Sequence, residues 1–87
     1  MKTRKGLSTF NDNGVINFKL YDTIILKIDG DNYTLNSGGW LTNHTKNCIN
    51  DNLPHGYRIF QQENTWKIQT PEAVLKFEDN QTINVKG

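Results

Sequence analysis

The stretch from Ser37 to Lys46 holds the side chains best suited to binding chemistry. Two adjacent glycines, Gly38 and Gly39, lie near its start, and a helix is expected to begin soon after them. The first N–H groups of a helix have no partner within it and lie at the positive end of its dipole, so they can hold a phosphate or a carboxylate. The candidate ligand-binding residues are Ser37, Gly38, Gly39, Trp40, Thr42, His44, Thr45 and Lys46.

The residue types in this stretch match the contacts that a nucleotide needs. Thr42 and Thr45 offer hydroxyls, and Lys46 offers a cation. Trp40 or His44 offers a flat face on which a base could stack. The phosphate-loop pattern and the three-glycine dinucleotide fingerprint are both absent from the sequence. Three interpretations stay open: a tight turn and capped helix with Trp40 buried, an anion or nucleotide site, and a protein-binding surface.

The sequence contains no set of residues with the spacing of a catalytic or metal site. His44 and His55 have only Asp51 nearby as an acid, which matches no zinc-site spacing. Cys48 follows His44 by one helical turn, but no third group is evident to orient the pair. Catalysis by the thiol is therefore a minor alternative. We expect a protein that is not an enzyme and that uses no metal or cofactor.

Composition argues against several other classes. Ten basic residues face nine acidic ones for a net charge of +1, which favours neither non-specific duplex binding nor mimicry of nucleic acid. The lone Cys48 allows no disulfide within the chain and fits a reducing compartment. Apolar stretches are too short for a signal peptide or a membrane span. The sequence therefore predicts a cytoplasmic protein with no membrane contact.

The elements that position the candidate site are mostly strands. Apolar residues alternate with polar ones over residues 15–20. Ile24, Leu26 and Ile28 form an apolar face of a second strand, and a turn at residues 29–32 leads to a strand at residues 33–35. From Leu41 the apolar spacing becomes that of a helix of about three turns, with Thr42 as its N-cap. Pro54 and Gly56 mark its end. Hairpins are expected over residues 57–68 and 74–85.

These patterns predict a single α+β domain over residues 1–87, with residues 1–8 as a flexible basic tail. Its antiparallel sheet of about six strands is expected to be strongly bent or barrel-like, with one short helix inserted after the first hairpin. Trp66, Tyr57 and Phe60 could form a stacking platform for single-stranded nucleic acid, with Lys67 and Arg58 beside it. Packing of these rings in the core is the favoured interpretation, because no cluster of arginines flanks them.

The segment from Thr34 to Asn50 resembles a pattern in small uncharacterised bacteriophage proteins. In those proteins Leu-Asn-Ser-Gly-Gly-Trp is followed by a threonine, then by Thr-Lys, and then by an apolar residue and an asparagine. The residues that keep this mutual spacing here are Trp40, Thr42, Thr45, Lys46 and Asn50. Cys48 stands where a basic residue would be commoner. The resemblance spans residues 23–52 and implies a phage origin and an accessory role.

By analogy with small phage proteins of this size, we expect an inhibitor of a host defence process that acts in the host-cell cytoplasm by stoichiometric binding. Its partner would be a host protein or a small nucleotide signal, with Ser37 to Lys46 in or near the binding surface. A single-stranded nucleic-acid-binding domain is the alternative. A homo-oligomer also stays open, because small domains with spare sheet edges often pair.

Overall fold

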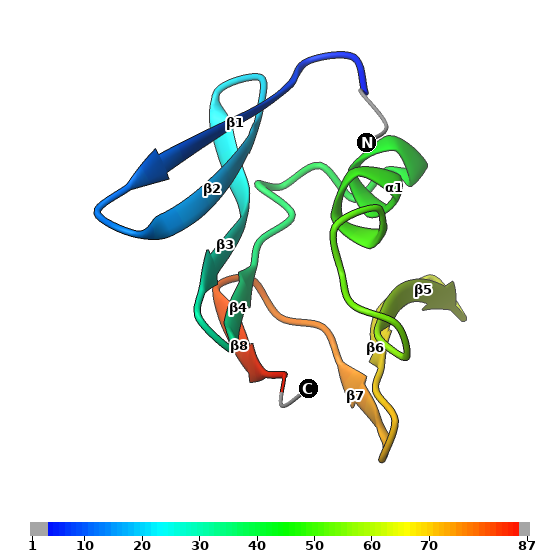
Figure 1. The fold of residues 1–87 in the computed structure, drawn as a ribbon. Helices are drawn as coiled ribbons and strands as arrows, with labels where there is room; N and C mark the ends of the chain where they lie inside the picture. Colours follow the sequence, from blue (N-terminus) through cyan, green and yellow to red (C-terminus); the bar gives the residue numbers. More distant parts are fainter. Residues whose placement is uncertain (1–3, 86–87) are drawn as a thin grey trace.

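The structure is a computed structural model and describes residues 4–85. In this range eight strands form two antiparallel sheets, and one helix follows the fourth strand (Figure 1). The elements are β1 (Leu7–Asp12), β2 (Val15–Leu20), β3 (Thr23–Asp29), β4 (Asn32–Leu35), α1 (Asn43–Asn50), β5 (Arg58–Gln62), β6 (Thr65–Gln69), β7 (Val74–Lys76) and β8 (Gln81–Asn84).

The larger sheet has five strands in the order β1-β2-β3-β4-β8. Its first four strands follow one another along the chain, because tight turns reverse the backbone between them. At the turn between β1 and β2, Asn13 and Gly14 have φ angles of 54° and 90°, the positive values that a two-residue hairpin turn needs. β8 arrives from the far end of the chain and pairs with β4, with Tyr33 opposite Ile83.

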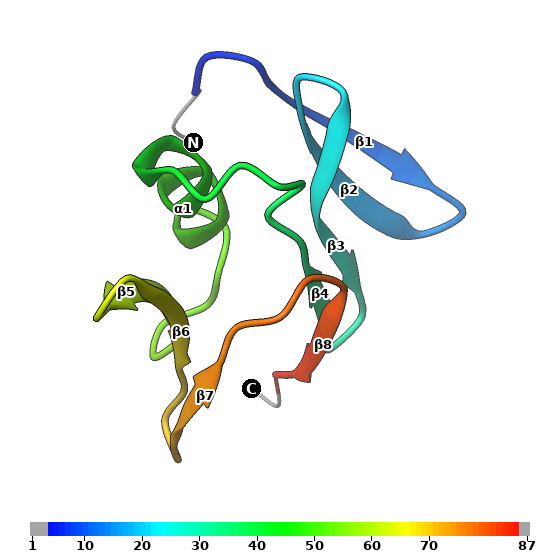
Figure 2. The same cartoon turned by 180° about the vertical axis from the view of Figure 1, so that it is seen from behind.

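The smaller sheet has three strands in the order β5-β6-β7. Glu63 and Asn64, with φ angles of 53° and 63°, form the turn between β5 and β6. α1 contacts β5 of this sheet and β3 of the other, and both views of the ribbon show it beside the two sheets (Figures 1 and 2). Both sheets and the helix contribute side chains to a shared core: Phe18, Leu20, Ile25, Leu26, Leu35, Cys48, Ile49, Ile59, Trp66, Ile68, Phe77, Ile83 and Val85.

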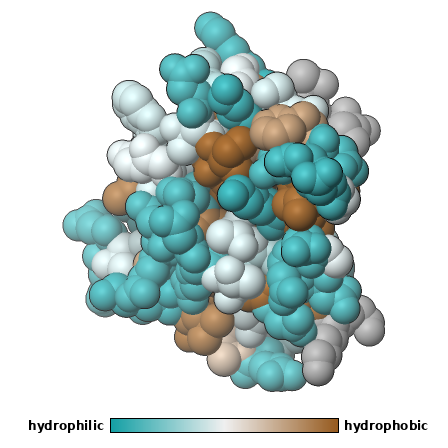
Figure 3. All heavy atoms as spheres, turned by 90° about the vertical axis from the view of Figure 1, so that its left-hand side faces the viewer, coloured by the Kyte–Doolittle hydropathy of each residue, from teal (hydrophilic) through white to brown (hydrophobic). Residues whose placement is uncertain are grey.

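The exterior is mixed in polarity. On the face drawn in Figure 3, hydrophobic side chains show as separate patches among hydrophilic ones. Asn17 is buried on β2, where its side-chain amide donates to the carbonyl oxygen of Val15 (3.0 Å). This hydrogen bond offsets the cost of burying the amide.

The structure confirms antiparallel strands with one short helix, and it corrects how the strands are grouped. The single bent or barrel-like sheet of about six strands is wrong, because the eight strands within residues 4–85 form two sheets and no closed barrel. The expected hairpin over residues 74–85 is also wrong. β7 pairs with β6, whereas β8 pairs with β4. Between them the chain crosses from one sheet to the other, and Phe77 is buried on the way.

The amino-terminal segment also differs from the expected flexible tail. Leu7 and Ser8 belong to β1, whose exposed and mostly polar residues show no alternation that would predict a strand. Before β1, Nε of Arg4 donates to a carboxylate oxygen of Asp51 (2.7 Å), and the Nη2 atom donates to the other oxygen (3.2 Å). The segment from Arg4 is thereby joined to the end of α1. Residues 1–3 of the expected tail lie outside the described residues.

The helix has the predicted N-cap and ends earlier than the sequence predicts. Thr42 is its N-cap, with an extended backbone and a side-chain oxygen that accepts from the N–H of Thr45. Asp51 caps the other end, so the helix stops before Leu53 and Pro54. The N–H of Leu53 donates to Asn50 in a turn and not to Ile49 in a continued helix. Among the described residues no helix has the length and apolar character needed to cross a membrane.

Candidate functional site

The turn between β4 and α1 is fixed at its first residue by Asp79. The N–H and the hydroxyl of Ser37 both donate to Oδ1 of Asp79, at 2.9 Å and 2.8 Å. Asp79 lies in the segment between the two sheets, so these bonds join the turn to the crossing that separates β7 from β8. Ser37 is buried, and the carboxylate strengthens both hydrogen bonds because it carries charge.

The following backbone N–H groups are also used within the turn. Gly38 donates to Oδ1 of Asn36 (2.8 Å), and Gly39 donates to the hydroxyl oxygen of Ser37 (3.1 Å). Trp40 donates to the carbonyl oxygen of Ser37 (3.0 Å). Gly38 and Gly39 have φ angles of 65° and 83°, which favour glycine. The N–H groups of residues 37–40 therefore all have internal acceptors, and none of the four is free to hold an anion.

The two threonines at the helix start serve the helix itself. Oγ1 of Thr42 accepts from the N–H of Thr45 (3.3 Å) and lies 3.1 Å from the hydroxyl of the same residue. Thr45 is buried, so its hydroxyl does not face solvent. The N–H of Lys46 donates to the carbonyl oxygen of Thr42 (3.1 Å). The N-cap thus satisfies the N–H of Thr45, as is usual for a capped helix.

Lys46 and His44 extend toward other parts of the chain. The ammonium of Lys46 lies 5.9 Å from the ring centroid of Trp66 and 3.5 Å from Oε1 of Gln61, so it points to the β5–β6 hairpin. Nε2 of His44 lies 2.8 Å from the carbonyl oxygen of Lys5, to which its N–H donates, and 4.0 Å from Sγ of Cys48. The structure thus does not bring these two side chains together with the threonine hydroxyls.

Trp40 and Leu41 project from the turn into solvent. Their exposed fractions are 63% and 62%, the largest of the exposed large hydrophobic residues. We call this pair the Trp40–Leu41 tip. The interpretation that buries Trp40 in the core is therefore wrong. The expected place of Leu41 on the apolar face of the helix is also wrong, because α1 begins at Asn43.

The chain matches the family model described as Kyanoviridae Gp96 protein over residues 2–84. It belongs to this phage protein family. The phage origin expected from the resemblance is thereby confirmed. Comparisons of this phage protein with curated proteins and with solved structures gave no match.

The thiol of this phage protein is shielded. Cys48 is completely buried in the core, and burial raises the pKa of its thiol, while the nearby Arg4 cation lowers it by less. The neutral thiol is therefore the favoured form, although His44 is near enough to touch it. A nucleophilic cysteine needs the opposite shift and an accessible sulfur. Among residues 4–85 no three His, Cys, Asp or Glu side chains gather to hold a metal ion.

Trp66 packs in the core, as the favoured interpretation of the later hairpin predicts, and the alternative of a stacking platform is wrong for this residue. Trp66 is only 5% exposed, and its ring meets Phe77 edge to face with centroids 5.2 Å apart. A base cannot stack on an indole whose face is covered in this way. Tyr57 is partly buried and packs against the same core.

Sequence reasoning missed the residues that shape the turn. Asp79 and Asn36 supply the acceptors that hold Ser37 and Gly38, and Leu41 adds to the apolar surface at the tip. Asp79 lies 42 residues from Ser37 in the chain. Its sequence signal is that of an ordinary turn acid, so no local pattern could have identified this partner. The signal for Asn36 was present, because a short polar side chain before two glycines commonly accepts from a nearby backbone N–H.

Proposed function

We propose that this phage protein acts by stoichiometric binding to a host protein, with the Trp40–Leu41 tip as the centre of the contact. The observation that carries the proposal is the exposure of an adjacent tryptophan and leucine on a turn whose backbone is held by internal hydrogen bonds. Tryptophan is enriched among the residues that carry most of the energy at protein interfaces.

The anchored turn favours binding because its backbone is already ordered before a partner binds. Asp79 fixes Ser37, and the N–H groups of Gly38, Gly39 and Trp40 are each bound within the turn. A contact that is already held in place loses less conformational entropy on association than a mobile loop would. The tip is therefore suited to insert into an apolar pocket on a partner protein.

A protein partner fits this site better than a sequestered nucleotide does. A nucleotide needs donors for its phosphates, and the N–H groups of residues 37–40 already donate within the turn. The ammonium of Lys46 points to the β5–β6 hairpin, where it lies near Gln61 and the ring of Trp66. Stacking on Trp40 alone would provide little specificity for one base over another.

The biological role that we propose is inhibition of a host defence process in the host-cell cytoplasm. Membership of a phage family supports a partner in the infected cell. The mechanism that we propose is occupation of a host protein surface without turnover, because Cys48, the one nucleophile weighed from the sequence, is buried with its thiol in the neutral form.

Affinity capture with matched variants tests this proposal. The immobilised chain, a Trp40→Ser variant and a Val74→Ser control are each exposed to host-cell lysate, and a retained protein is then purified and titrated by calorimetry. Val74 suits the control because it is also an exposed apolar residue but lies on β7. We expect equimolar binding to the wild type and the control, and a loss of roughly thirtyfold, or about 2 kcal/mol, in Trp40→Ser.

Equal retention of the same protein by wild type and Trp40→Ser would contradict the proposal. Calorimetry with a panel of cyclic and ADP-ribose-type nucleotides distinguishes the remaining alternative. Saturable binding of one of them, reduced in Trp40→Ser, would show a nucleotide sponge in place of a protein inhibitor.

A further inference from the structure

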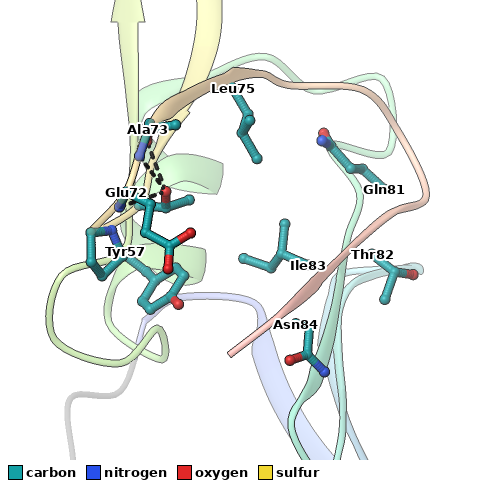
Figure 4. Close-up of a pocket in the computed structure, with 10 residues that line it drawn as sticks. Tyr57, Glu72, Ala73, Leu75, Gln81, Thr82, Ile83 and Asn84 are labelled. Carbon is teal, nitrogen blue, oxygen red and sulfur yellow. Dashed lines mark hydrogen bonds between the residues drawn. The ribbon is translucent and has the colours of Figure 1, made fainter. Parts of the chain in front are cut away.

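A groove lies between the two sheets on the side away from β3. It has a volume of about 630 Å³, and its walls come from β8 on one side and from the β6–β7 connection and β7 on the other. Figure 4 shows the side chains of Leu75 and Ile83 directed into the same space, with Tyr57 and Glu72 at its margin. The volume is within the range of roughly 300–1,000 Å³ that is typical of ligand sites.

β8 borders this groove as an edge strand. It is the last strand in the order β1-β2-β3-β4-β8, so its neighbour among the described residues is β4 alone. The N–H of Val85 donates to the carbonyl oxygen of Asp31 (2.7 Å). Val85 and Asp31 therefore form a hydrogen-bonded pair. Because hydrogen-bonded and non-hydrogen-bonded pairs alternate in an antiparallel ladder, Ile83 and Tyr33, two residues away, also form a hydrogen-bonded pair.

The alternation leaves the main-chain groups of Thr82 and Asn84 directed away from β4. Both residues sit at non-hydrogen-bonded positions, where side chains of opposite strands are closest. Two side-chain bonds agree with this assignment: the hydroxyl of Thr82 lies 2.9 Å from that of Thr34, and the amide of Asn84 donates to Asn32 (3.0 Å). Each of the two residues therefore presents one N–H and one carbonyl at the free edge of the sheet.

The edge lacks the charged residues and the proline that often discourage strand pairing. β8 contains Gln81, Thr82, Ile83 and Asn84, with no charge and no proline. Natural sheets commonly protect an exposed edge with lysine, proline or a bulge. The unprotected main-chain groups, at the margin of an apolar space, have the donors and acceptors that a second extended backbone would complement.

The groove also has a single charged wall residue. Glu72 is the only ionisable acid or base among its lining residues apart from the phenol of Tyr57. The N–H groups of Glu72 and Ala73 donate to the hydroxyl of Thr70 (3.3 Å and 3.0 Å), which fixes the turn that carries the carboxylate. Among residues 4–85 no side chain pairs with this carboxylate. A basic side chain in the groove would therefore find an opposite charge at its margin.

We infer that the groove beside β8 binds an extended peptide segment of a partner protein, which adds a strand to the larger sheet. The peptide backbone pairs with Thr82 and Asn84, an apolar side chain lies against Ile83 and Leu75, and a lysine or arginine meets Glu72. None of the groove residues belongs to the Trp40–Leu41 tip, so this inference does not depend on the proposed function.

A library of short random peptides, selected on the full chain and counter-selected on a Leu75→Lys variant, tests the inference. We expect enriched peptides that alternate apolar with polar residues and carry a lysine or arginine. In spectra of the isotope-labelled chain, synthetic copies should shift the amide signals of Thr82 and Asn84. We expect Leu75→Lys to weaken binding by about tenfold, because it places a cation at an apolar contact.

Matched controls separate strand addition from other binding. Val74→Lys changes the neighbouring residue on the other face of β7, outside the groove lining, and should leave the affinity within about twofold. Glu72→Gln should weaken basic peptides by about threefold and leave neutral ones unchanged. Two peptides with alternating backbone N-methylation, offset by one residue, should differ, because only one of them loses the N–H groups that face β8.

Four results would overturn the inference. The first is an absence of peptides enriched on the wild type over Leu75→Lys. The second is equal binding of the two N-methylated peptides. The third is a concentration-dependent dimer in sedimentation whose formation protects the Thr82 and Asn84 amides, which would assign this edge to a second copy of the chain. Loss of binding in Trp40→Ser but not in Leu75→Lys would place the peptide on the tip and also overturn the inference.

Discussion

Trp40 and Trp66 share a residue type and occupy opposite environments. Trp40 is 63% exposed at the turn before α1, whereas Trp66 is 5% exposed and packs edge to face on Phe77. Trp66 belongs to β6, where its strand alternation points it into the core shared by both sheets. Trp40 follows Gly39 in a turn whose backbone hydrogen bonds are satisfied by local acceptors and by Asp79. The comparison shows that tertiary contacts, more than residue type, determine which indole is available to a partner.

The largest expected effect is the difference in stability between variants of the two tryptophans. Trp66→Ala removes a core side chain and leaves a cavity against Phe77, so we expect the free energy of unfolding to fall by about 3–5 kcal/mol. Trp40→Ala removes a mostly exposed ring, and the expected change is within about 0.5 kcal/mol. Urea denaturation followed by circular dichroism measures both. Similar losses in the two variants would mean that Trp40 also packs in the core and would remove the contrast.

Local sequence patterns predicted the features that depend only on residues close together in the chain. The alternation around Trp66 and the cap at Thr42 involve partners within a few positions, and both are found in the structure. The exposure of Trp40 depends on the turn that Asp79 anchors, 42 residues beyond Ser37. The division into two sheets depends in the same way on the distant pairing of β8 with β4. Such long-range contacts have no local signal in one sequence, and a hairpin between β7 and β8 fitted the pattern equally well.

Asp79, which holds the turn below the Trp40–Leu41 tip, provides the second test of the comparison. Asp79→Ala leaves the buried N–H and hydroxyl of Ser37 without their acceptor, and we expect a loss of about 1–2 kcal/mol in the free energy of unfolding. Asp79→Asn keeps an oxygen that can accept, so it should recover at least half of that loss. Hydrogen exchange of the Ser37 and Gly39 amides should quicken in the alanine variant. Unchanged exchange there would show that the turn holds its shape without Asp79.

Cys48 lies in the same core as Trp66, and its pH-dependent contribution to stability is the smallest expected effect. Because burial raises the pKa of this thiol in the folded state, folded and unfolded chains both bind its proton below the pKa of a free thiol, about 8.5. Above that pH the unfolded chain loses the proton first, so the contribution of Cys48 to stability falls as pH rises. Denaturation at about pH 7 and about pH 10 should therefore show a smaller gap between wild type and Cys48→Ala at the higher pH. A constant gap would mean an ordinary, accessible thiol.

The account as a whole depends on an indole at position 40 that is free to meet a partner. The most direct measurement is iodide quenching of tryptophan fluorescence in a Trp66→Phe variant, in which Trp40 is the only tryptophan. We predict emission at the long wavelength of a solvated indole and strong quenching by iodide, with the reverse behaviour in the matched Trp40→Phe variant. Blue-shifted emission from Trp40 that iodide does not quench would contradict the account.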